Sequence, residues 1–306
     1  MKLLLPWLMG VLSLPALLTA GERVVIATAN LTSGHRQSYR EAGDRILQAL
    51  KPDIVAVQEF NVPDAGGPRA WVDRVFGEDF HFMIEEGDDP IPCGVVSRYP
   101  ITAAGEWQDP QVPDRDFAWA TIDLPGAIDL HVVSVHLHGS GKRASRKKEA
   151  RVLVGQAAEF PAADYMVLCG DFNATDRDEP AVKVLEQLFS DAQVPLDQNG
   201  NSNTNLNRNK PYDWVMPDAE LERLHVPLEF AGRTFPHGMV FDSRLWDPPP
   251  APARKEDSAA PMMQHMAVVK AFELPEGKNA GPPSNAAGPD GSAALRRRHA
   301  GARISR

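Results

Sequence analysis

The chain of 306 residues contains only two cysteines, Cys93 and Cys169. Two thiols form at most one bridge, so a disulfide framework of the kind that holds small exported domains together is excluded. Both cysteines lie in apolar runs typical of core strands, where a cysteine acts as a small hydrophobic side chain. The sequence leaves open whether they pair, and it is compatible with an oxidising compartment without requiring one.

Positive charge is also scarce through most of the chain. Residues 21–274 contain 25 basic residues against 39 acidic ones, a net charge of −14. A body this acidic argues against broad electrostatic capture of nucleic acid, although a local basic patch can still steer a phosphorylated substrate. One such patch is the first half of a predicted helix over residues 142–160, which holds six basic residues. It is either a solvated helix face or a funnel for a polyanionic substrate.

Long apolar runs are absent beyond the first twenty residues, so no further membrane span is expected. The N-terminal stretch has Lys2, an apolar segment over Leu3–Leu18 that Pro6 interrupts, and small residues ending at Ala20. This is the pattern of a signal peptide over residues 1–20. We therefore expect a protein exported to the periplasm or the cell exterior. An uncleaved membrane anchor is the alternative.

The chain shows no internal repeat, and its last part has few apolar residues. Residues 275–306 are rich in Pro, Gly, Ala and Asn and end in a basic run. Such a segment cannot bury enough apolar surface to offset the entropy lost on folding, which predicts a disordered basic tail. Its end is either solvated or in contact with anionic polymers. One domain over residues 21–274, acting as a monomer, is expected between signal peptide and tail.

Strands and helices alternate at the start of this domain. Val24–Asn30 is predicted to be a strand, Tyr39–Leu50 has the apolar spacing of an amphipathic helix, and Asp53–Glu59 is a second predicted strand. Strand, helix, strand is the start of an α/β layer. Further strands are predicted at 80–85, 94–97, 118–124, 129–137, 165–169, 211–216, 241–246 and 265–274, and further helices at 142–160 and 180–189.

The most informative run is Val167–Asn173. A buried strand over Tyr165–Cys169 is followed by Gly170, which lets the backbone turn, and then by Asp171 and Asn173. Residues two apart at a strand end point the same way, so this carboxylate and carboxamide can converge on one ligand. A phosphate or a hard cation suits them. The alternative is an ordinary Asp/Asn turn.

Polar residues end five of the predicted strands and open a sixth, the last one. Six such positions predict one site, assembled at an edge of a sheet. The residues concerned are Asn30, Glu59, His136, the pair Asp171 and Asn173, Asp213 and His265.

In this order, the motifs around these residues resemble the endonuclease/exonuclease/phosphatase superfamily, which the deoxyribonuclease I fold typifies. The resemblance implies an α/β (α+β) fold, a four-layer α/β/β/α sandwich with two mixed sheets face to face and helices outside. It also implies Mg²⁺- or Mn²⁺-dependent hydrolysis of phosphate esters. The motifs are Thr28-Ala29-Asn30-Leu31, Val57-Gln58-Glu59, Ser97-Arg98-Tyr99-Pro100-Ile101, Ser134-Val135-His136-Leu137, Gly170-Asp171-Phe172-Asn173, Tyr212-Asp213-Trp214-Val215 and Gln264-His265.

The resemblance implies a role for each residue. Glu59 holds the metal with Asn30 beside it, since both offer the oxygen ligands that a hard cation prefers. Asp171 accepts the proton of the attacking water or helps to bind metal, and Asn173 orients the phosphate. His136 and His265 flank the phosphoryl group as donors and proton carriers.

Three further residues receive supporting roles from the same resemblance. Asp213 holds the tautomer and charge of His265, while Arg115 and Thr204 contact the phosphate. The chain departs from the family at Gln264, where many members have an aspartate that contributes to the metal site. The amide oxygen can still coordinate a cation, but one negative charge is lost, so weaker metal binding or a single metal is expected.

The expected function is thus an exported, metal-dependent phosphoesterase. Its substrate is a nucleic acid, a phospholipid headgroup or a small phosphate ester. A lipid-active enzyme needs exposed apolar loops, for which Trp71, Phe76, Trp107 and Trp246 are candidates. The alternative is a non-catalytic module that keeps the fold and binds a phosphate ligand.

Overall fold

A computed structural model of the chain describes residues 21–32, 41–62, 66–139, 141–261 and 263–275. The predicted signal peptide and the predicted tail from residue 276 lie outside this described part. Within it, no helix combines the length and apolar character needed to cross a membrane.

The described residues form two large mixed sheets and one hairpin. The hairpin joins β11 (Leu228–Phe230) and β12 (Arg233–Phe235). The first sheet has the order β10 (His225–Val226), β14 (Ala267–Leu274), β1 (Glu22–Asn30), β2 (Ile54–Gln58), β4 (Gly94–Ser97), β3 (His81–Ile84), with β13 (Met239–Phe241) also paired to β14. The second has the order β5 (Ile101–Trp107), β6 (Phe117–Ile122), β7 (Leu130–His136), β8 (Tyr165–Asp171), β9 (Asp213–Pro217).

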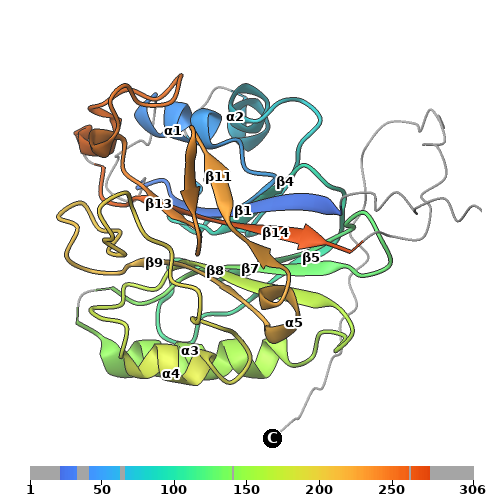
Figure 1. The fold of residues 1–306 in the computed structure, drawn as a ribbon. Helices are drawn as coiled ribbons and strands as arrows, with labels where there is room; N and C mark the ends of the chain where they lie inside the picture. The colour runs from blue at the N-terminus through green and yellow to red at the C-terminus, as the bar shows by residue number, and fades with distance from the viewer. Residues whose placement is uncertain (1–20, 33–40, 63–65, 140, 262, 276–306) are drawn as a thin grey trace, which may run out of the picture.

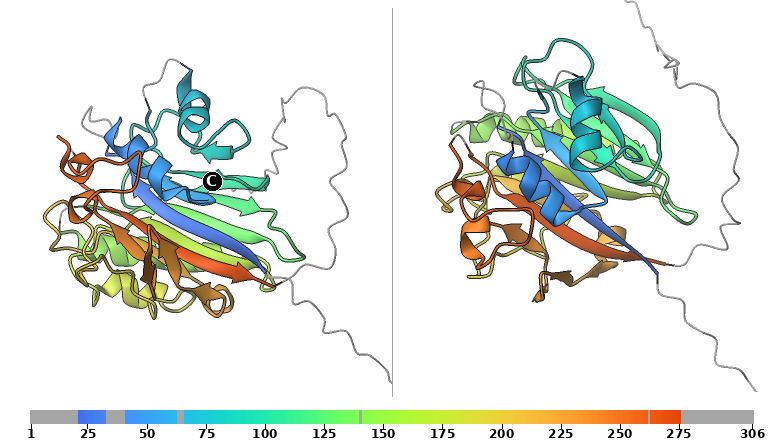
Figure 2. Two further views of the ribbon diagram at one scale, coloured as in Figure 1. Left: turned by 45° about the horizontal axis from the view of Figure 1, so that its top comes forward. Right: turned by 90° about the horizontal axis from the view of Figure 1, so that it is seen from above.

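Helices cover the outer faces of both sheets. α1 (Ala42–Leu50) and α2 (Gly67–Val75) lie over the first sheet, and α3 (Arg143–Ala157) and α4 (Pro180–Leu185) lie over the second (Figure 1). The turned views place α1 and α2 on the outer side of the same strands (Figure 2). The short elements are α5 (Ala219–Glu222), η1 (Ser243–Leu245) and η2 (Asp257–Ala259). The predicted four-layer α/β/β/α sandwich is confirmed.

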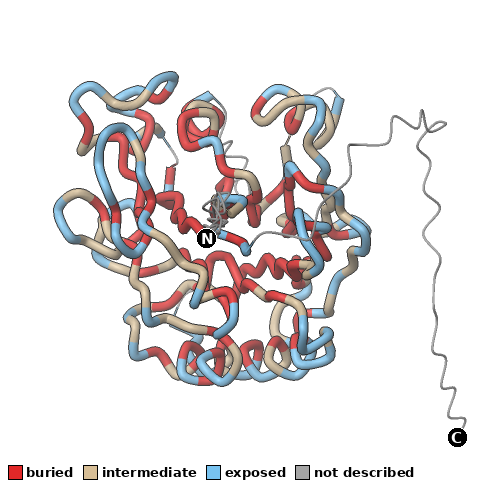
Figure 3. The backbone as a smooth tube through the Cα atoms, turned by 45° about the vertical axis from the view of Figure 1, so that its right-hand side comes forward, coloured by how far each residue is buried: buried red, intermediate tan, exposed pale blue. Residues whose placement is uncertain are grey.

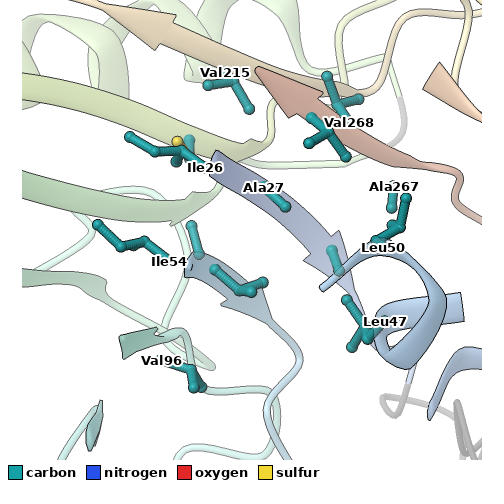
Figure 4. Close-up of a cluster of buried hydrophobic side chains, with 14 of the residues drawn as sticks. Ile26, Ala27, Leu47, Leu50, Ile54, Val96, Val215, Ala267 and Val268 are labelled. Carbon is teal, nitrogen blue, oxygen red and sulfur yellow. The ribbon is translucent and has the colours of Figure 1, made fainter. Parts of the chain in front are cut away.

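Apolar side chains from both sheets fill the space between them. Ile26 and Ile54 of the first sheet belong to the same buried cluster as Val215 of the second (Figure 4). A second cluster joins Leu168 of β8 to Leu153 of α3 and its neighbours in α4. The central strands are therefore buried on both faces, which is why they are continuous apolar runs and why buried backbone passes through the middle of the molecule (Figure 3).

Strand direction brings the polar strand ends to one edge. β1 runs parallel to β2 with Asn30 opposite Gln58, and β7 runs parallel to β8 with His136 opposite Asp171. β9 runs antiparallel to β8 and begins with Asp213 opposite Asp171. The carboxyl ends of the two parallel pairs and the start of β9 therefore meet at one edge of the sandwich.

Gly170 makes the close pairing of β7 and β8 possible. A Cβ atom at this position would lie 1.9 Å from the carbonyl oxygen of Val135. No larger residue fits without separating the two strands that carry His136 and Asp171.

Several predicted elements differ in the structure. The strand predicted at 241–246 ends at Phe241 and continues as the 3-10 turn η1, because Asp242 caps that turn by accepting the amide of Arg244. Several elements were not predicted, among them β5, an edge strand with little apolar alternation, and α2, which begins within a Gly-Gly-Pro run. The short elements β10, β11, β12 and α5 were not predicted either. Cys93 and Cys169 are free and buried, which settles the open question of their pairing.

Candidate active site

Asn30 connects the two sheets at the site. Its Nδ2 donates to Glu59 Oε1 at 3.3 Å and to Asp171 Oδ2 at 3.1 Å. Its oxygen accepts the amide of Thr32 at 2.8 Å. Glu59 follows β2 with a positive φ of 53°, a backbone conformation that costs free energy for a non-glycine residue and that clusters at functional sites. The turn aims the Glu59 carboxylate at Asn30 rather than along the strand.

Asp171 lies at the centre of the cluster and is buried. Its Oδ1 accepts the amide of Asn173 at 2.8 Å, and its Oδ2 accepts Asn173 Nδ2 at 3.2 Å. The Nε2 atoms of His136 and His265 lie 3.3 Å and 3.7 Å from the same Oδ2. Asn173 also has a positive φ, of 48°, which folds its side chain back over the strand end. One carboxylate is thus surrounded by donors from both sheets.

His265 lies between two carboxylates. Its Nδ1 is 3.1 Å from Asp213 Oδ2, and its Nε2 faces Asp171. Burial by itself would lower the pKa of His265, but the Asp213 and Asp171 charges outweigh burial and raise the pKa to about 9. The ring therefore carries its second proton at neutral pH.

His136 has the opposite character. Burial lowers the pKa of His136 well below its usual value, and the nearby charges of Arg115 and His265 lower it further. Arg115 Nε donates to the carbonyl of His136 at 2.6 Å, and a terminal nitrogen of the same guanidinium donates to the carbonyl of Leu137 at 3.2 Å. A neutral and a protonated imidazole therefore face the same carboxylate, which is the arrangement that separates proton-donating from proton-accepting roles.

The protonation of Asp171 is balanced near neutrality. Burial raises the pKa of Asp171 to about 7, and the charge of Asp213 adds to this effect while His265 opposes it. A carboxyl group whose pKa lies near the working pH is suited to accept and release a proton.

A chain of buried polar side chains beneath the site connects the two sheets, and it was not predicted from the sequence. Gln58 Nε2 donates to Ser134 Oγ at 3.0 Å, and Thr28 Oγ1 donates to Gln58 Oε1 at 3.1 Å. All three side chains are fully buried. Their types in otherwise apolar strands are the only sequence signal that could have revealed the contact, because buried polar groups need partners.

The donor set fits a hard divalent cation. Glu59 and Asp171 supply carboxylate oxygens on either side of Asn30. Asn30 faces both with Nδ2 and its oxygen bonds to the amide of Thr32, so ligation of a metal by Asn30 requires its amide group to turn over. Near them, Asp213 Oδ1 and His136 Nδ1 are buried without a hydrogen-bond partner among the described residues, as expected where a ligand completes the site.

Geometry alone offers a second grouping, in which ligand atoms of Asp171, Asp213 and His265 lie within 4.8 Å of one another. A protonated imidazole has no lone pair for a metal. Because the two carboxylates favour the protonated form of His265, we prefer the oxygen set around Asn30 and Glu59.

Seven of the site residues predicted from the sequence lie together at this edge of the sandwich. Three others, Arg115, Thr204 and Gln264, were predicted to contact the phosphate or the metal. Arg115 is buried with its guanidinium on backbone carbonyls and Asp114, and Thr204 is buried with its Oγ1 accepting the amide of Asp213 at 2.8 Å. Gln264 is exposed beside His265. The phosphate contacts of Arg115 and Thr204 and the metal contact of Gln264 stay predictions. The seven are Asn30, Glu59, His136, Asp171, Asn173, Asp213 and His265.

The fold and the site together are those of the deoxyribonuclease I-like class of α/β proteins. Residues 39–236 match the endonuclease/exonuclease/phosphatase family, and this span is well over half of the chain. The chain therefore belongs to that family, whose members are mostly hydrolases that act on phosphate esters and generally depend on divalent metals.

Solved structures agree with this assignment at the level of the fold. An endonuclease/exonuclease/phosphatase from Bacteroides vulgatus is 16% identical with a TM-score of 0.59, over 83% of this chain and 100% of that one. Another from Beutenbergia cavernae is 18% identical with a TM-score of 0.56, over 82% and 72%. D. rerio TDP2, solved with a single strand DNA product, is 17% identical with a TM-score of 0.55, over 82% and 99%. No curated protein sequence matches the chain.

Proposed function

We propose that this protein is a divalent-metal-dependent phosphoesterase that cleaves a phosphodiester or phosphomonoester by attack of water. The observation that carries the proposal is the convergence on Asp171 of Asn30, Asn173, His136 and His265 from both sheets. An isolated Asp/Asn turn would not gather these groups, so the structure favours the functional interpretation of the Gly170–Asn173 run.

The chemistry follows from the protonation of these groups. Protonated His265 donates a hydrogen bond to a phosphoryl oxygen, where negative charge builds as water attacks. Asp171 accepts the proton that the water loses, and Asn173 fixes the direction of the carboxylate. The bond from phosphorus to the ester oxygen breaks as the new bond to water forms, and the alcohol leaves after its oxygen takes up a proton from solvent. Asp213 holds His265 in its charged form and fixed orientation. A bound Mg²⁺ or Mn²⁺, held by Glu59, Asn30 and Asp171, would supply Lewis-acid stabilisation of the phosphoryl oxygens.

Some of the residues that the sequence suggested for substrate contact are buried in the structure. Two of the aromatic residues considered for a membrane-facing loop, Trp71 and Trp246, are buried in the core. Arg146 in the basic helix is also buried, and its Nε donates to Glu179 at 2.7 Å. Two aromatic residues are therefore not available to contact a lipid, and one basic residue of the helix is not available to contact a polyanion. The other five basic residues of the helix are exposed or half-buried, so nucleic acid, a phospholipid headgroup and a small phosphate ester all stay candidate substrates.

Hydrolysis assays with chromogenic and natural esters test the proposal. Wild-type protein is assayed on bis-p-nitrophenyl phosphate, p-nitrophenyl phosphate and plasmid DNA, each with Mg²⁺, Mn²⁺ or EDTA. We expect turnover that requires metal, with the preferred compound identifying the substrate class. No turnover with any metal or compound would replace this proposal with the non-catalytic phosphate-binding module.

Two histidines of β7 provide a matched pair of variants. His131 bonds to Thr121 Oγ1 and Asp164 Oδ2, each at 3.0 Å, and stacks on Phe160, so its contacts are structural. We expect His136→Gln to lower turnover by about 10²-fold or more, the usual range for a group that handles protons. His131→Gln should leave turnover unchanged. Equal losses in both variants would show that β7 matters only as a strand.

Export is proposed on the sequence pattern of residues 1–20. When the full chain is produced in a bacterium with a secretory pathway, the mature protein is expected outside the cytoplasm and should begin at Gly21. N-terminal sequencing of the fractionated protein checks this. An intact Met1 on membrane-bound protein would favour the uncleaved anchor.

A further inference from the structure

The segment from Asp197 to Asn209 folds into successive turns that present oxygen atoms inward. Asp197 Oδ1 accepts the amides of Asn199 and Asn201 at 2.8 Å and 2.9 Å. Asn201 Oδ1 accepts the amide of Asn203 at 2.9 Å. Such Asx turns use side-chain oxygens in place of a regular backbone ladder. The segment therefore needs an interior donor to hold its remaining oxygens together.

The guanidinium of Arg208 is that donor. Its Nε donates to the carbonyl of Asn203 at 2.7 Å, one terminal nitrogen donates to Asp197 Oδ2 at 2.6 Å, and the other donates to Asp242 Oδ2 at 2.6 Å. Its side chain is 12% exposed. A planar guanidinium with fixed donor directions suits this set of oxygens in a way that a lysine ammonium does not. Two buried carboxylates and a backbone carbonyl thus accept from the guanidinium of Arg208, and Asp242 also pairs with Arg244 at 2.7 Å.

The backbone of Arg208 is strained to achieve this. Its φ is 54°, in the left-handed region that a residue with a Cβ atom adopts at a cost in free energy. The hydrogen bonds of its side chain offset that cost. A glycine at this position adopts the same φ without strain, so Arg208→Gly removes the guanidinium without leaving an uncompensated backbone cost.

The residues that follow Asn203 bond directly to the site. Thr204 Oγ1 accepts the amide of Asp213 at 2.8 Å, and the Thr204 carbonyl accepts the amide of Met266 at 2.7 Å. Asn205 pairs with His265 as an isolated antiparallel bridge, and the amide of Leu206 donates to the carbonyl of Gln264 at 2.9 Å. Residues 204–206 therefore hold both the start of β9 and the backbone on either side of His265.

We propose that Arg208 is a positioning residue for the hydrolysis proposed above: by fixing Asn203 and the turns before it, the guanidinium sets where residues 204–206 hold Asp213 and His265. It acts through the backbone and touches no reacting atom. The inference rests on the proposed function for its kinetic consequence, and on geometry alone for its effect on the loop.

A cavity beside Arg208 makes a sharp test possible. Its volume is about 440 Å³, and its lining includes Arg208, Asp197, Asp242 and Arg244. Once the side chain is removed, free guanidinium ion can enter from this side and occupy the oxygens that the side chain leaves. Restoration by a small cation of the same shape distinguishes positioning by the guanidinium from a general need for the residue.

The kinetic experiment compares wild type, Arg208→Gly and Arg208→Lys. We expect Arg208→Gly to lower kcat by about 10- to 100-fold with little change in KM, since small misplacement of catalytic groups is costly. Guanidinium chloride at a non-denaturing concentration should restore a large part of kcat, while the same concentration of KCl should not. Arg208→Lys should stay impaired. An unchanged kcat in Arg208→Gly, or equal effects of the two salts, would overturn the proposal.

A second measurement needs no turnover, so it separates this inference from the proposed function. Hydrogen exchange of the metal-free protein is expected to be faster at residues 204–206, 213 and 264–266 in Arg208→Gly, and to slow again with guanidinium. The control is Arg98→Ala, which removes an arginine bound to Glu22 and Asp53 at the opposite end of the first sheet and should leave these amides unchanged. Unchanged exchange in Arg208→Gly, or an even increase over the whole molecule, would contradict the proposal.

Discussion

Two of the buried carboxyl groups whose pKa is strongly raised lie in regions of the molecule that allow a direct comparison. One is Asp171 at the strand edge, with a pKa of about 7, and the other is Glu149 in α3, with a pKa of about 8. Burial is the main cause in both, and a neighbouring carboxyl group adds to it, Asp213 in the first case and Asp109 in the second. By their pKa values alone the two regions look alike.

Their surroundings differ in kind. Both oxygens of Glu149 accept one backbone amide, that of His138, so the group holds the chain after β7 in place. Asp171 instead faces side-chain donors from several separate strands, and beside it lie Asp213 Oδ1 and His136 Nδ1 without partners among the described residues. A shifted pKa therefore does not mark a site by itself. Because Asp109, which bonds to Glu149, also has a buried oxygen without a partner among the described residues, the convergence of side-chain donors from several strands is what marks the site.

The largest expected effect is on Asp171. Asp171→Asn keeps the shape but cannot accept a proton, so turnover should fall by about 10³-fold. The free energy of unfolding at neutral pH should stay within about 1 kcal/mol of wild type or rise, because a buried carboxyl group that burial disfavours is replaced by a neutral one. Steady-state kinetics and urea unfolding measure both. A stable variant with full turnover would remove Asp171 from the reaction.

Asp213→Asn is expected to lower turnover by about 10²-fold. The variant removes the charge that keeps His265 protonated and oriented, while the hydrogen bond that the Asp213 amide donates to Thr204 Oγ1 stays possible. Kinetics on the preferred ester checks the size of the loss. Comparison with Asp218→Asn, which changes a buried carboxylate at the other end of β9, controls for changes in the strand. If both variants lose the same activity, the role of Asp213 is structural.

Glu149→Gln should change the pH dependence of stability and leave turnover intact. The folded protein binds the Glu149 proton more tightly than the unfolded chain does, since the pKa rises from 4.5 to about 8. The free energy of unfolding of the wild type therefore falls as pH rises through the window from 4.5 to about 8. In Glu149→Gln this fall should be smaller than in the wild type, by up to about 1.4 kcal/mol per pH unit. Burial also raises the pKa of Glu85 to about 8, so Glu85 contributes to the pH dependence of the unfolding free energy in both proteins. Urea unfolding across the window measures this, and identical slopes would refute it.

The smallest effect is expected at Gln264. Gln264→Asp restores a negative charge beside the site and should tighten Mg²⁺ binding by roughly tenfold, since a unit charge a few ångströms from a cation contributes about 1 kcal/mol or more. Calorimetric titration of Mg²⁺ into both proteins checks it. Unchanged or weaker binding would show that Gln264 does not reach the metal.

The sequence predicted which polar side chains lie together at one sheet edge, but it missed several of the strands and helices, for a physical reason. Buried central strands are continuous apolar runs, so a charged or amide residue at their ends, such as Asp171 or Asn30, stands out. An edge strand such as β5 has one face in solvent and lacks this contrast, and α2 begins in a glycine and proline run that usually marks a turn.

Contacts between distant segments could not be predicted from local pattern. The bond from Gln58 to Ser134 joins residues 76 positions apart, and the pair formed by Arg208 and Asp242 depends on a loop whose path no periodicity reveals. The burial of Trp71 and Arg146 was missed for the same reason. Residue type and position predicted which polar side chains lie at the strand ends. Only the tertiary structure shows which distant residues hold those side chains in place.

The most direct test of the comparison is the initial rate of bis-p-nitrophenyl phosphate hydrolysis as Mn²⁺ is added, for wild type, Asp171→Asn and Glu149→Gln under one protocol. A rate that rises and saturates with metal is predicted for wild type and Glu149→Gln, against a flat baseline for Asp171→Asn. Metal-dependent rates of similar size in all three proteins, or a loss confined to Glu149→Gln, would contradict the account.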